Sequence, residues 1–232
     1  MSKNFRYFKS SPEVIRLAVM MYVRFPLSLR HVEELLFERG IDVCHETIRY
    51  WWNRFGPVFA KEIGKRRLRH PVQHSNWRWH LDEVFVKING ERCYLWRAVD
   101  HEGTVLDAIA TKKRDKAAAY KFLKALMKKY GKPKRIVTDR LSSYRAALRD
   151  PNLTRLQECG CWMNNRAENS HLPFRRREYA MLKFRKLETL EKFTSVHSQL
   201  YNHFNGERHL NNRQTYRQFR SEALSEWRAL AA

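Results

Sequence analysis

Asp82, Asp139 and Glu168 are the side chains of this sequence best suited to chemistry on a phosphodiester. Cleavage of such a bond needs a polarised phosphate, an activated water and a stabilised leaving oxygen, and two metal ions about 3.5 to 4 Å apart supply all three. Asp82 lies in the apolar stretch WHLDEVFVK, where an unpaired charge would be costly and a bound metal explains it. Because hard Mg²⁺ prefers carboxylate ligands, the three acids predict a site for two Mg²⁺ ions, with Mn²⁺ as a substitute.

Neighbouring acids are weaker candidates for this metal site. Glu83 directly follows Asp82 on an expected strand, and successive strand residues point to opposite faces, so we do not expect both to reach one metal pair. Asp100 and Asp107 fall at the ends of expected strands. We interpret these two acids as turn or solvated residues.

Other reactive side chains receive ordinary interpretations. His80 and His171 flank two of the acids, and a lone His more often makes a local hydrogen bond than serves as a general base. Cys159 and Cys161 lack a second Cys or His pair at the spacing of a structural zinc site, so we expect reduced thiols. Trp162 lies just before the third acid, and an aromatic ring there could stack on a displaced base.

The elements expected after residue 76 bring the three acids to one place. Alternating aromatic and branched residues, the hairpin signal Asn89-Gly90 and an amphipathic stretch predict strands at 77–88, 92–99 and 104–110, a helix at 116–130 and a strand at 135–138. In this α/β order the later strand can lie parallel beside the first. Further elements are expected as a short helix at 144–148, a loop at 150–152, a strand near 156, a helix from 165 and an amphipathic helix at 187–204. The three acids then lie in the middle of the first strand, at the end of the fourth strand, and on the helix from residue 165.

The first 70 residues show the apolar periodicity of helices. Apolar residues recur at helical spacing in three segments: Ile15, Ala18, Val19 and Tyr22 after Pro12; Leu29, Val32, Leu35 and Leu36 between Ser28 and Gly40; and Ile48, Trp51, Trp52 and Phe55 after Cys44. The last two helices, with the short turn between them, follow the helix-turn-helix pattern, whose second helix enters the major groove of DNA. The candidate DNA contacts are His45, Arg49, Lys65, Arg66 and Arg67. The alternative is a plain three-helix bundle that binds nothing.

The composition indicates a polyanionic partner. The chain has 232 residues, with 46 Lys and Arg against 24 Asp and Glu, a formal net charge of +22 and a pI near 10.2. Nucleic acid is favoured because phosphate contacts reward dispersed Lys and Arg, and an anionic membrane surface is the weaker alternative. No run of about 18 apolar residues is present, and no uncharged apolar core follows the first ten residues, so we expect a cytoplasmic protein without a membrane span or secretory signal.

Three motifs resemble the catalytic motifs of bacterial insertion-sequence-six family transposases. They are HLDEV at 80–84, VTD at 137–139 with Tyr144 following, and NNRAENSH at 164–171, and RAVD at 97–100 and FRRRE at 174–178 are similar to that family too. The resemblance implies a DDE transposase with a ribonuclease H-like core, Mg²⁺, terminal inverted repeats as the DNA target, and cut-and-join chemistry. It covers the chain from its N-terminal helices to its C-terminus.

The resemblance also bears on partners and on the last basic cluster. Arg175 and Arg176 are on charge alone equally well a solvated basic face, and the resemblance favours contact with DNA phosphate. Transposon ends and target DNA are the expected duplex partners, in a bacterial protein associated with the nucleoid. Because two ends must be paired, we expect a homodimer or a higher oligomer.

We therefore expect three segments: a helix-turn-helix head at 1–70, a ribonuclease H-like catalytic core at 71–185 after a linker at Pro71, and C-terminal helices at 186–232 that pack on the core. Two other functions compete with this one. A structure-selective nuclease on the same fold would use similar acids without joining ends, and a non-catalytic DNA-binding regulator would leave the three acids unexplained. The phosphate loop GxxxxGK[ST] is absent from the sequence, so ATP-driven chemistry is not indicated.

Overall fold

The computed structural model describes residues 5–69, 78–139, 142–149, 154–159, 164–205 and 211–230, with the backbone alone at 67–69, 142 and 145. Five features named above lie outside this description: the linker at Pro71, the loop at 150–152, the side chain of Arg67, Cys161 and Trp162. The chain forms two compact units. The helical unit comprises Met1–Arg69, Tyr179–Met181 and Ser195–Ala232, and the sheet unit comprises His70–Glu178 and Leu182–Thr194.

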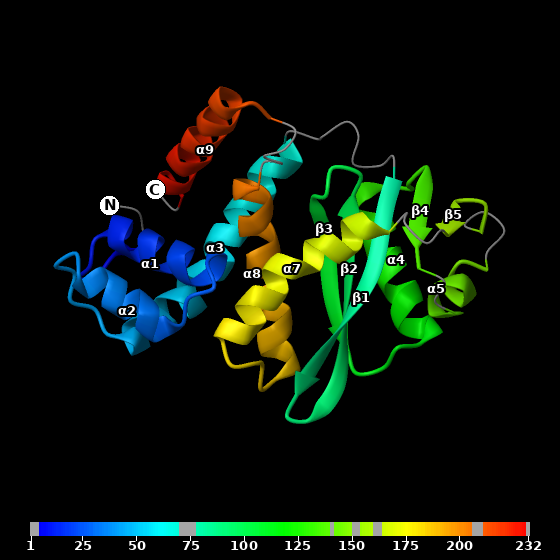
Figure 1. Ribbon diagram of the computed structural model, residues 1–232, viewed down its shortest axis with the longest axis horizontal. Helices are drawn as coiled ribbons and strands as arrows, with labels where there is room; N and C mark the ends of the chain where they lie inside the picture. The colour runs from blue at the N-terminus through cyan, green and yellow to red at the C-terminus, as the bar shows by residue number, and fades with distance from the viewer. Residues whose placement is uncertain are drawn as a thin grey trace. The chain divides into compact units, whose positions relative to one another are not determined.

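The helical unit begins with the three predicted helices, which the structure confirms as α1 (Pro12–Arg24), α2 (Leu29–Phe37) and α3 (His45–Arg69) (Figure 1). Ser11 and Ser28 cap the first two helices, because each hydroxyl accepts a hydrogen bond from a backbone N–H in the first turn. Gly40 follows α2 with a φ of 72°, a left-handed conformation that suits glycine. The predicted apolar residues of these helices are buried, except for the partly exposed Leu29 and Leu35.

Two further helices, α8 (Leu187–Phe204) and α9 (Arg213–Arg228), follow in the chain. Residues 186–232 are predicted from the sequence to pack on the core, whereas in the structure the segment from Ser195 onward groups with α1 to α3. The reason is aromatic packing: the ring centroid of Trp227 lies 5.2 Å from that of Phe59 and 5.8 Å from that of Phe204. None of the described helices is both long enough and apolar enough to cross a membrane.

The sheet unit contains a five-stranded mixed sheet. Its strands are β1 (Arg78–Ile88), β2 (Glu91–Asp100), β3 (Val105–Thr111), β4 (Arg135–Thr138) and β5 (Gln157–Cys159), in the spatial order β3-β2-β1-β4-β5. The first three strands form an antiparallel meander, and β4 lies parallel to β1, as predicted. Asn89 and Gly90 both have positive φ, as a type I′ hairpin requires. A mixed sheet with flanking helices is the fold expected for a ribonuclease H-like core.

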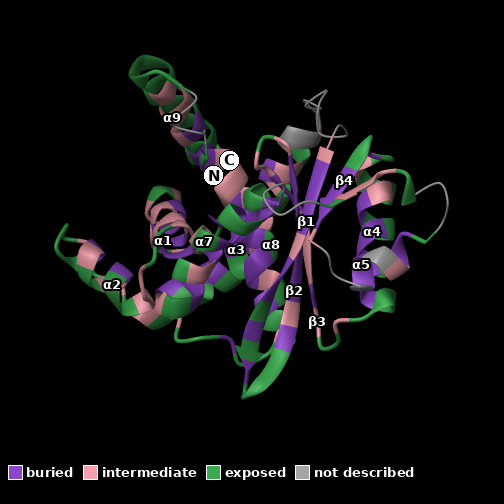
Figure 2. Cartoon of the chain, turned by 45° about the vertical axis from the view of Figure 1, so that its right-hand side comes forward, coloured by how far each residue is buried: buried purple, intermediate pink, exposed green. Residues whose placement is uncertain are grey.

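Helices cover the two faces of this sheet. On one face α4 (Lys116–Tyr130) and α5 (Ser142–Ala147) pack their apolar side chains against Trp79, Leu81 and Trp96. Buried positions accordingly run along β1 (Figure 2). On the other side, α7 (Asn165–Ala180) lies along β1, since residues at its N-terminal end and in its middle bond to that strand. The predicted helix from residue 165 therefore continues through Pro173 and spans the sheet.

Candidate active site at the end of the fourth strand

Asp82 and Asp139 meet where β4 ends beside β1. The last paired residues of these strands are Leu81 and Thr138, so the next residue on each chain is an aspartate at the same level of the sheet. Carboxylate oxygens of Asp82, Glu83 and Asp139 lie within 4.8 Å of one another. Over the described part of the chain, this is the one cluster of three or more His, Cys, Asp or Glu side chains close enough to hold a metal ion together. The structure thus unites two of the three predicted acids.

Glu83 joins this cluster, and the prediction that it could not reach the same site as Asp82 was wrong. On β1, the Glu83 side chain lies on the same face of the sheet as Leu81, which is covered by α4 and α5. The Asp82 side chain lies on the opposite face, toward α7. Alternation is therefore kept, but β4 stops one residue earlier. Asp139 occupies the open edge that both faces share, and the long Glu83 side chain reaches it.

Among the described residues, Arg114 is a cationic partner of this cluster. Arg114 forms an ion pair with Glu83, and its Nη2 lies 4.0 Å from Asp139 Oδ2. Burial, reinforced by the neighbouring charge of Asp139, raises the pKa of Glu83 to about 7 even though Arg114 opposes the shift. Three carboxylates whose oxygens lie within 4.8 Å of one another offer the oxygen ligands that a hard divalent cation prefers. The donor set therefore fits Mg²⁺.

His171 fixes the orientation of the Asp82 carboxylate from α7. Its Nε2 lies 3.1 Å from Asp82 Oδ2, and the ring is buried. Burial lowers the pKa of His171 and outweighs the opposing effect of Asp82, so the imidazole is neutral near pH 7. An ionised carboxylate only accepts hydrogen bonds, so Nε2 is the nitrogen that carries the proton. The prediction that His171 makes a local hydrogen bond is confirmed.

Glu168 lies on the first turn of α7, between two contacts of that helix with β1. Four residues before it, the Asn164 side-chain amide donates a 3.0 Å hydrogen bond to the carbonyl of Leu81, and three residues after it comes His171. All three positions therefore share one helix face, directed at the strand that carries Asp82. The Glu168 side chain is exposed and is not in the group whose oxygens lie within 4.8 Å. The structure thus brings Glu168 to the site's side of α7 without placing it in the cluster.

The predicted DNA contacts of the head all come from α3. His45 pairs with Glu33 at 2.9 Å, and Arg49 pairs with Glu46 at 2.9 Å while remaining half exposed. Near the other end of α3, Lys65 is exposed, and Arg66 is partly buried and donates to the carbonyl of Glu226 at 3.4 Å.

The remaining basic and acidic candidates divide between structural and exposed positions. Arg175 binds Glu178 and the carbonyl of Phe85, whereas its neighbour Arg176 is exposed. Asp100 accepts hydrogen bonds from the backbone N–H groups of the turn between β2 and β3, which confirms its interpretation as a turn residue. Asp107, on β3, pairs with Lys129 at 3.3 Å at the surface.

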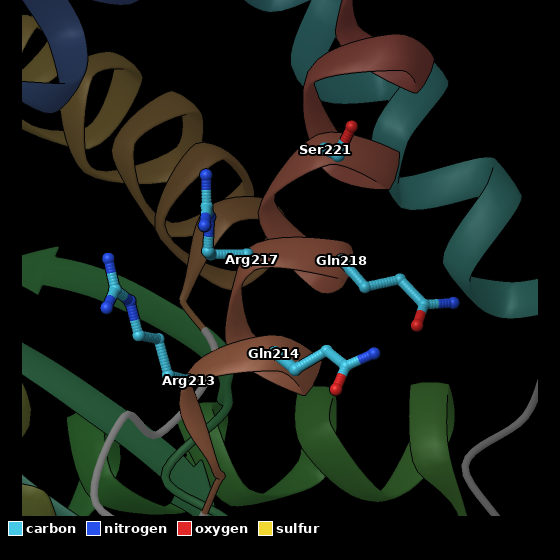
Figure 3. Close-up of a pocket in the computed structure, with 5 residues that line it drawn as sticks. All are labelled: Arg213, Gln214, Arg217, Gln218 and Ser221. Atoms are coloured by element: carbon cyan, nitrogen blue, oxygen red, sulfur yellow. The ribbon is translucent and has the colours of Figure 1, made fainter.

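A separate hollow lies on the helical unit. All its lining residues come from α9, and they are Arg213, Gln214, Arg217, Gln218 and Ser221 (Figure 3). None of them is acidic, and none belongs to the predicted site. The candidate site therefore remains the carboxylate cluster of the sheet unit.

Two participants in the cluster, Glu83 and Arg114, are not predicted by the sequence pattern. Glu83 was set aside by strand alternation, and Arg114 lies in the turn before α4, where nothing in its local pattern separates it from other surface cations. The one signal for Glu83 in the sequence was the apolar run Val84 to Val86 that follows it, because such a run predicts a strand buried on both faces.

Comparison with known proteins gives one family and several relatives. The family model described as "DDE domain" matches residues 76–207, more than half of the chain. Over 172 residues the chain is 36% identical to the transposase for insertion sequence-like element IS431mec of Staphylococcus aureus, covering 72% of this chain and 75% of the relative. The transposase for insertion sequence element IS257 in transposon Tn4003, also from Staphylococcus aureus, matches with the same identity and coverage.

Solved structures give weaker likenesses. The integrase catalytic core domain of HTLV-2 in complex with magnesium (trimeric form) aligns with a TM-score of 0.43 at 17% identity, covering 62% of this chain and 97% of that one. The catalytic domain of Mos1 mariner transposase aligns with a TM-score of 0.39 at 13% identity, covering 73% of this chain and 90% of that one.

Proposed function

Because this chain belongs to the DDE transposases of the insertion-sequence-six family, we propose that it binds the terminal inverted repeats of an insertion sequence, cleaves DNA strands at those ends and joins them to target DNA. Asp82, Asp139 and Glu168 are the catalytic acids of this proposal. The observation that carries it is the meeting of Asp82 and Asp139 at the end of β4, with their carboxylate oxygens within 4.8 Å. Glu168 is supported by its place on the face of α7 that lies along β1.

Two divalent metal ions are the cofactors that this donor set would hold. Asp82, Asp139 and Glu168 would be their ligands, and Glu83 would adjoin the site as the partner of Arg114. Bound there, Mg²⁺, or Mn²⁺ in its place, polarises the phosphate and lowers the pKa of the attacking water. His171 holds the Asp82 carboxylate in one orientation through the hydrogen bond at Nε2. Arg114 balances part of the negative charge before DNA arrives.

DNA is bound through the head and the basic face of α7 in this proposal. The N-terminal half of α3 would enter the major groove and present His45 and Arg49 to base edges. Lys65, Arg66 and Arg67 would contact phosphates, as would Arg176 beside the site. Arg175 would join them only by releasing part of its bonding to Glu178 and Phe85.

Assembly and location follow from the reaction. Two transposon ends must be held together for joining, so we propose a homodimer or a higher oligomer in the paired-end complex. Because the substrate is chromosomal and plasmid DNA of a bacterium, the proposed place of action is the nucleoid in the cytoplasm.

A joining assay tests this function. Purified full-length protein is incubated with Mg²⁺, a labelled inverted-repeat end and a target plasmid, and covalently joined products are measured. Asp82→Asn, Asp139→Asn and Glu168→Gln should each abolish cleavage and joining while leaving binding to end DNA intact, because each removes a metal ligand outside the head. Asp107→Asn, which changes a surface acid outside the cluster, should leave the products unchanged.

Two outcomes would contradict the proposal. If one of the three variants still joins ends at the wild-type rate, the residue replaced in it is not a metal ligand. Efficient nicking without any joined species, under conditions that support paired ends, would replace the transposase reaction by that of a structure-selective nuclease.

A further inference from the structure

Beyond the carboxylate cluster, β1 and β2 continue as a two-stranded arm. Pairing of β4 with β1 stops at Leu81, and pairing of β3 with β2 reaches only as far as Tyr94 (Figure 1). Directly opposed residues of antiparallel strands lie on the same face, so Phe85 and Tyr94 share the face of Glu83. Lys87 and Arg92 are the next pair along it. The sheet face that carries Glu83 therefore extends into a surface of aromatic and cationic side chains.

Phe85 is the prominent apolar group of that surface. It is 43% exposed although it lies on a strand whose other apolar residues are buried. Its ring packs edge-on against Tyr94, with 5.3 Å between centroids, which is an ordinary cross-strand pair. This pairing leaves nearly half of the side chain in contact with water. Exposure of a large aromatic close to the carboxylate cluster costs free energy, and a ligand that stacks on the ring would offset that cost.

Two guanidinium groups lie over the same ring at cation–π distance. Arg92 lies 5.1 Å from the centroid of Phe85, and Arg114 lies 5.5 Å from it. Arg114 is also the partner of Glu83 and lies 4.0 Å from Asp139, so it joins the ring to the carboxylate cluster. Phe85 follows Glu83 by two strand residues on one face, a separation of about 7 Å. A DNA strand whose scissile phosphate lies at the cluster would place a neighbouring nucleotide over this ring.

We propose that Phe85 is a stacking platform for an unpaired DNA base next to the scissile phosphate, with the base taking the place of the exposed Arg92 guanidinium over the ring. The chemistry fits a single strand: an aromatic face stacks on any base, and adjacent cations bind its phosphates. Bases inside a duplex already stack on their neighbours, so the ring engages a base at a frayed or overhanging end. This inference rests on the proposed transposase reaction and adds the part of the substrate that lies outside the duplex.

Fluorescence quenching tests the platform without any turnover. Full-length protein is titrated into an end duplex that is already cut, carries an unpaired 2-aminopurine at the cleaved end and finishes in a 3′-deoxy nucleotide, so that joining cannot occur. Wild-type protein should quench the 2-aminopurine. Phe85→Ala should abolish the quenching and weaken binding of the overhang about 5- to 150-fold while leaving a blunt duplex bound equally well. Phe85→Trp should restore both signals.

Two further variants separate stacking from folding. Phe85→Leu keeps an apolar side chain against Tyr94 but lacks an aromatic face, so it should melt like the wild type and still fail to quench. Tyr120→Ala removes another half-exposed aromatic of the sheet unit, on α4, and should change neither quenching nor affinity. Wild-type quenching in Phe85→Leu would overturn the platform, and so would an absence of quenching in the wild type.

The joining assay and the quenching assay fail independently. Joined products without quenching by the wild type would remove the platform and leave the proposed transposase reaction standing. Quenching that depends on Phe85, in a protein that never joins ends, would remove the proposed reaction and keep a binding site for unpaired DNA.

Discussion

Glu83 has a strongly raised pKa in the candidate site. Its pKa is raised from 4.5 to about 7, chiefly by burial and then by Asp139. Between these two pH values the folded chain binds the proton that the unfolded chain releases, so the free energy of unfolding falls as pH rises. The contribution of Glu83 is therefore present in full below pH 4.5 and is lost as pH passes about 7.

Glu83→Gln should remove this pH dependence in protein free of divalent ions. We expect the variant to be more stable than the wild type by about 2 kcal/mol at pH 8 and equal to it at pH 4.5; the full pKa difference would give more, but water screens part of it. Added Mg²⁺ should narrow the gap at pH 8, because the cation favours the ionised carboxylates. Thermal melts of both proteins across this pH range, with and without Mg²⁺, measure the effect.

Glu102→Gln is the matched control, since Glu102 is half exposed in the turn after β2. It should melt like the wild type at every pH. A pH dependence shared by wild type and Glu83→Gln would show that burial of Glu83 is not what destabilises the metal-free protein.

At the scale of single residues, the sequence predicted the two aspartates of the site and not their neighbours. The positions of Asp82 and Asp139 could be predicted because they depend on backbone pairing alone. When β4 lies parallel to β1, the residues that follow Leu81 and Thr138 lie side by side. Glu83 and Arg114 depend on how far a side chain reaches past the end of β4. Strand alternation describes the direction of Cβ and says nothing about that reach.

Among the elements, α7 decides whether Glu168 can approach the cluster. The helix begins where the Asn164 side chain, itself buried, donates to the Leu81 carbonyl at 3.0 Å. Asn164→Ala should remove this buried hydrogen bond and cost about 0.5 to 1.5 kcal/mol of stability. We expect the first turn of α7 to lose protection in hydrogen exchange and strand joining to slow, because Glu168 lies on that turn.

Asn169→Ala provides the comparison, since Asn169 is exposed on the same helix. It should change stability by no more than about 0.5 kcal/mol. If hydrogen exchange of the first α7 turn is unchanged in Asn164→Ala, then other contacts, such as that of His171, position Glu168 without Asn164.

Elements with strong local signals were predicted closely. Helix α4 has the predicted bounds because Asp115 caps its start and Gly131 ends it with positive φ. Helix α9 was not delineated, since only Ala223 and Trp227 of its residues are buried and so sparse a pattern gives no clear period. The family predicted from three short motifs is confirmed by the DDE domain match and by the insertion-sequence relatives.

At the scale of the whole molecule, net charge is determined by composition, whereas packing is determined by contacts between residues far apart in sequence. The net charge of +22 follows from composition and favours DNA whatever the fold. Which helices stabilise the head does not follow from composition, because it depends on contacts between residues far apart in sequence. The division of the chain into three domains at residues 70 and 185 stays a prediction. The structure nevertheless groups Ser195–Ala232 with the first 69 residues, so the head is expected to depend on the C-terminus for its stability.

Trp227→Ala tests that dependence. Trp227 is 2% exposed and packs against Phe59 of α3 and Phe204 of α8, while nearby Arg16 donates to the Leu230 carbonyl at 2.8 Å. Removal of the indole should leave a cavity and cost about 3 to 5 kcal/mol, comparable with the whole stability of a small unit. We expect chemical denaturation to show early unfolding of the helical unit and binding of end DNA to fall with it.

Arg228→Ala changes the exposed neighbour of Trp227 and separates this packing effect from loss of charge. It should leave stability within about 0.5 kcal/mol of the wild type and reduce DNA affinity only through one phosphate contact at most. If Trp227→Ala instead matched Arg228→Ala in both measurements, α9 would contribute nothing to the head. The N-terminal helices would then have to be stable through the contacts of α1, α2 and α3 alone, and a fragment ending at Arg69 should bind DNA as tightly as the full chain.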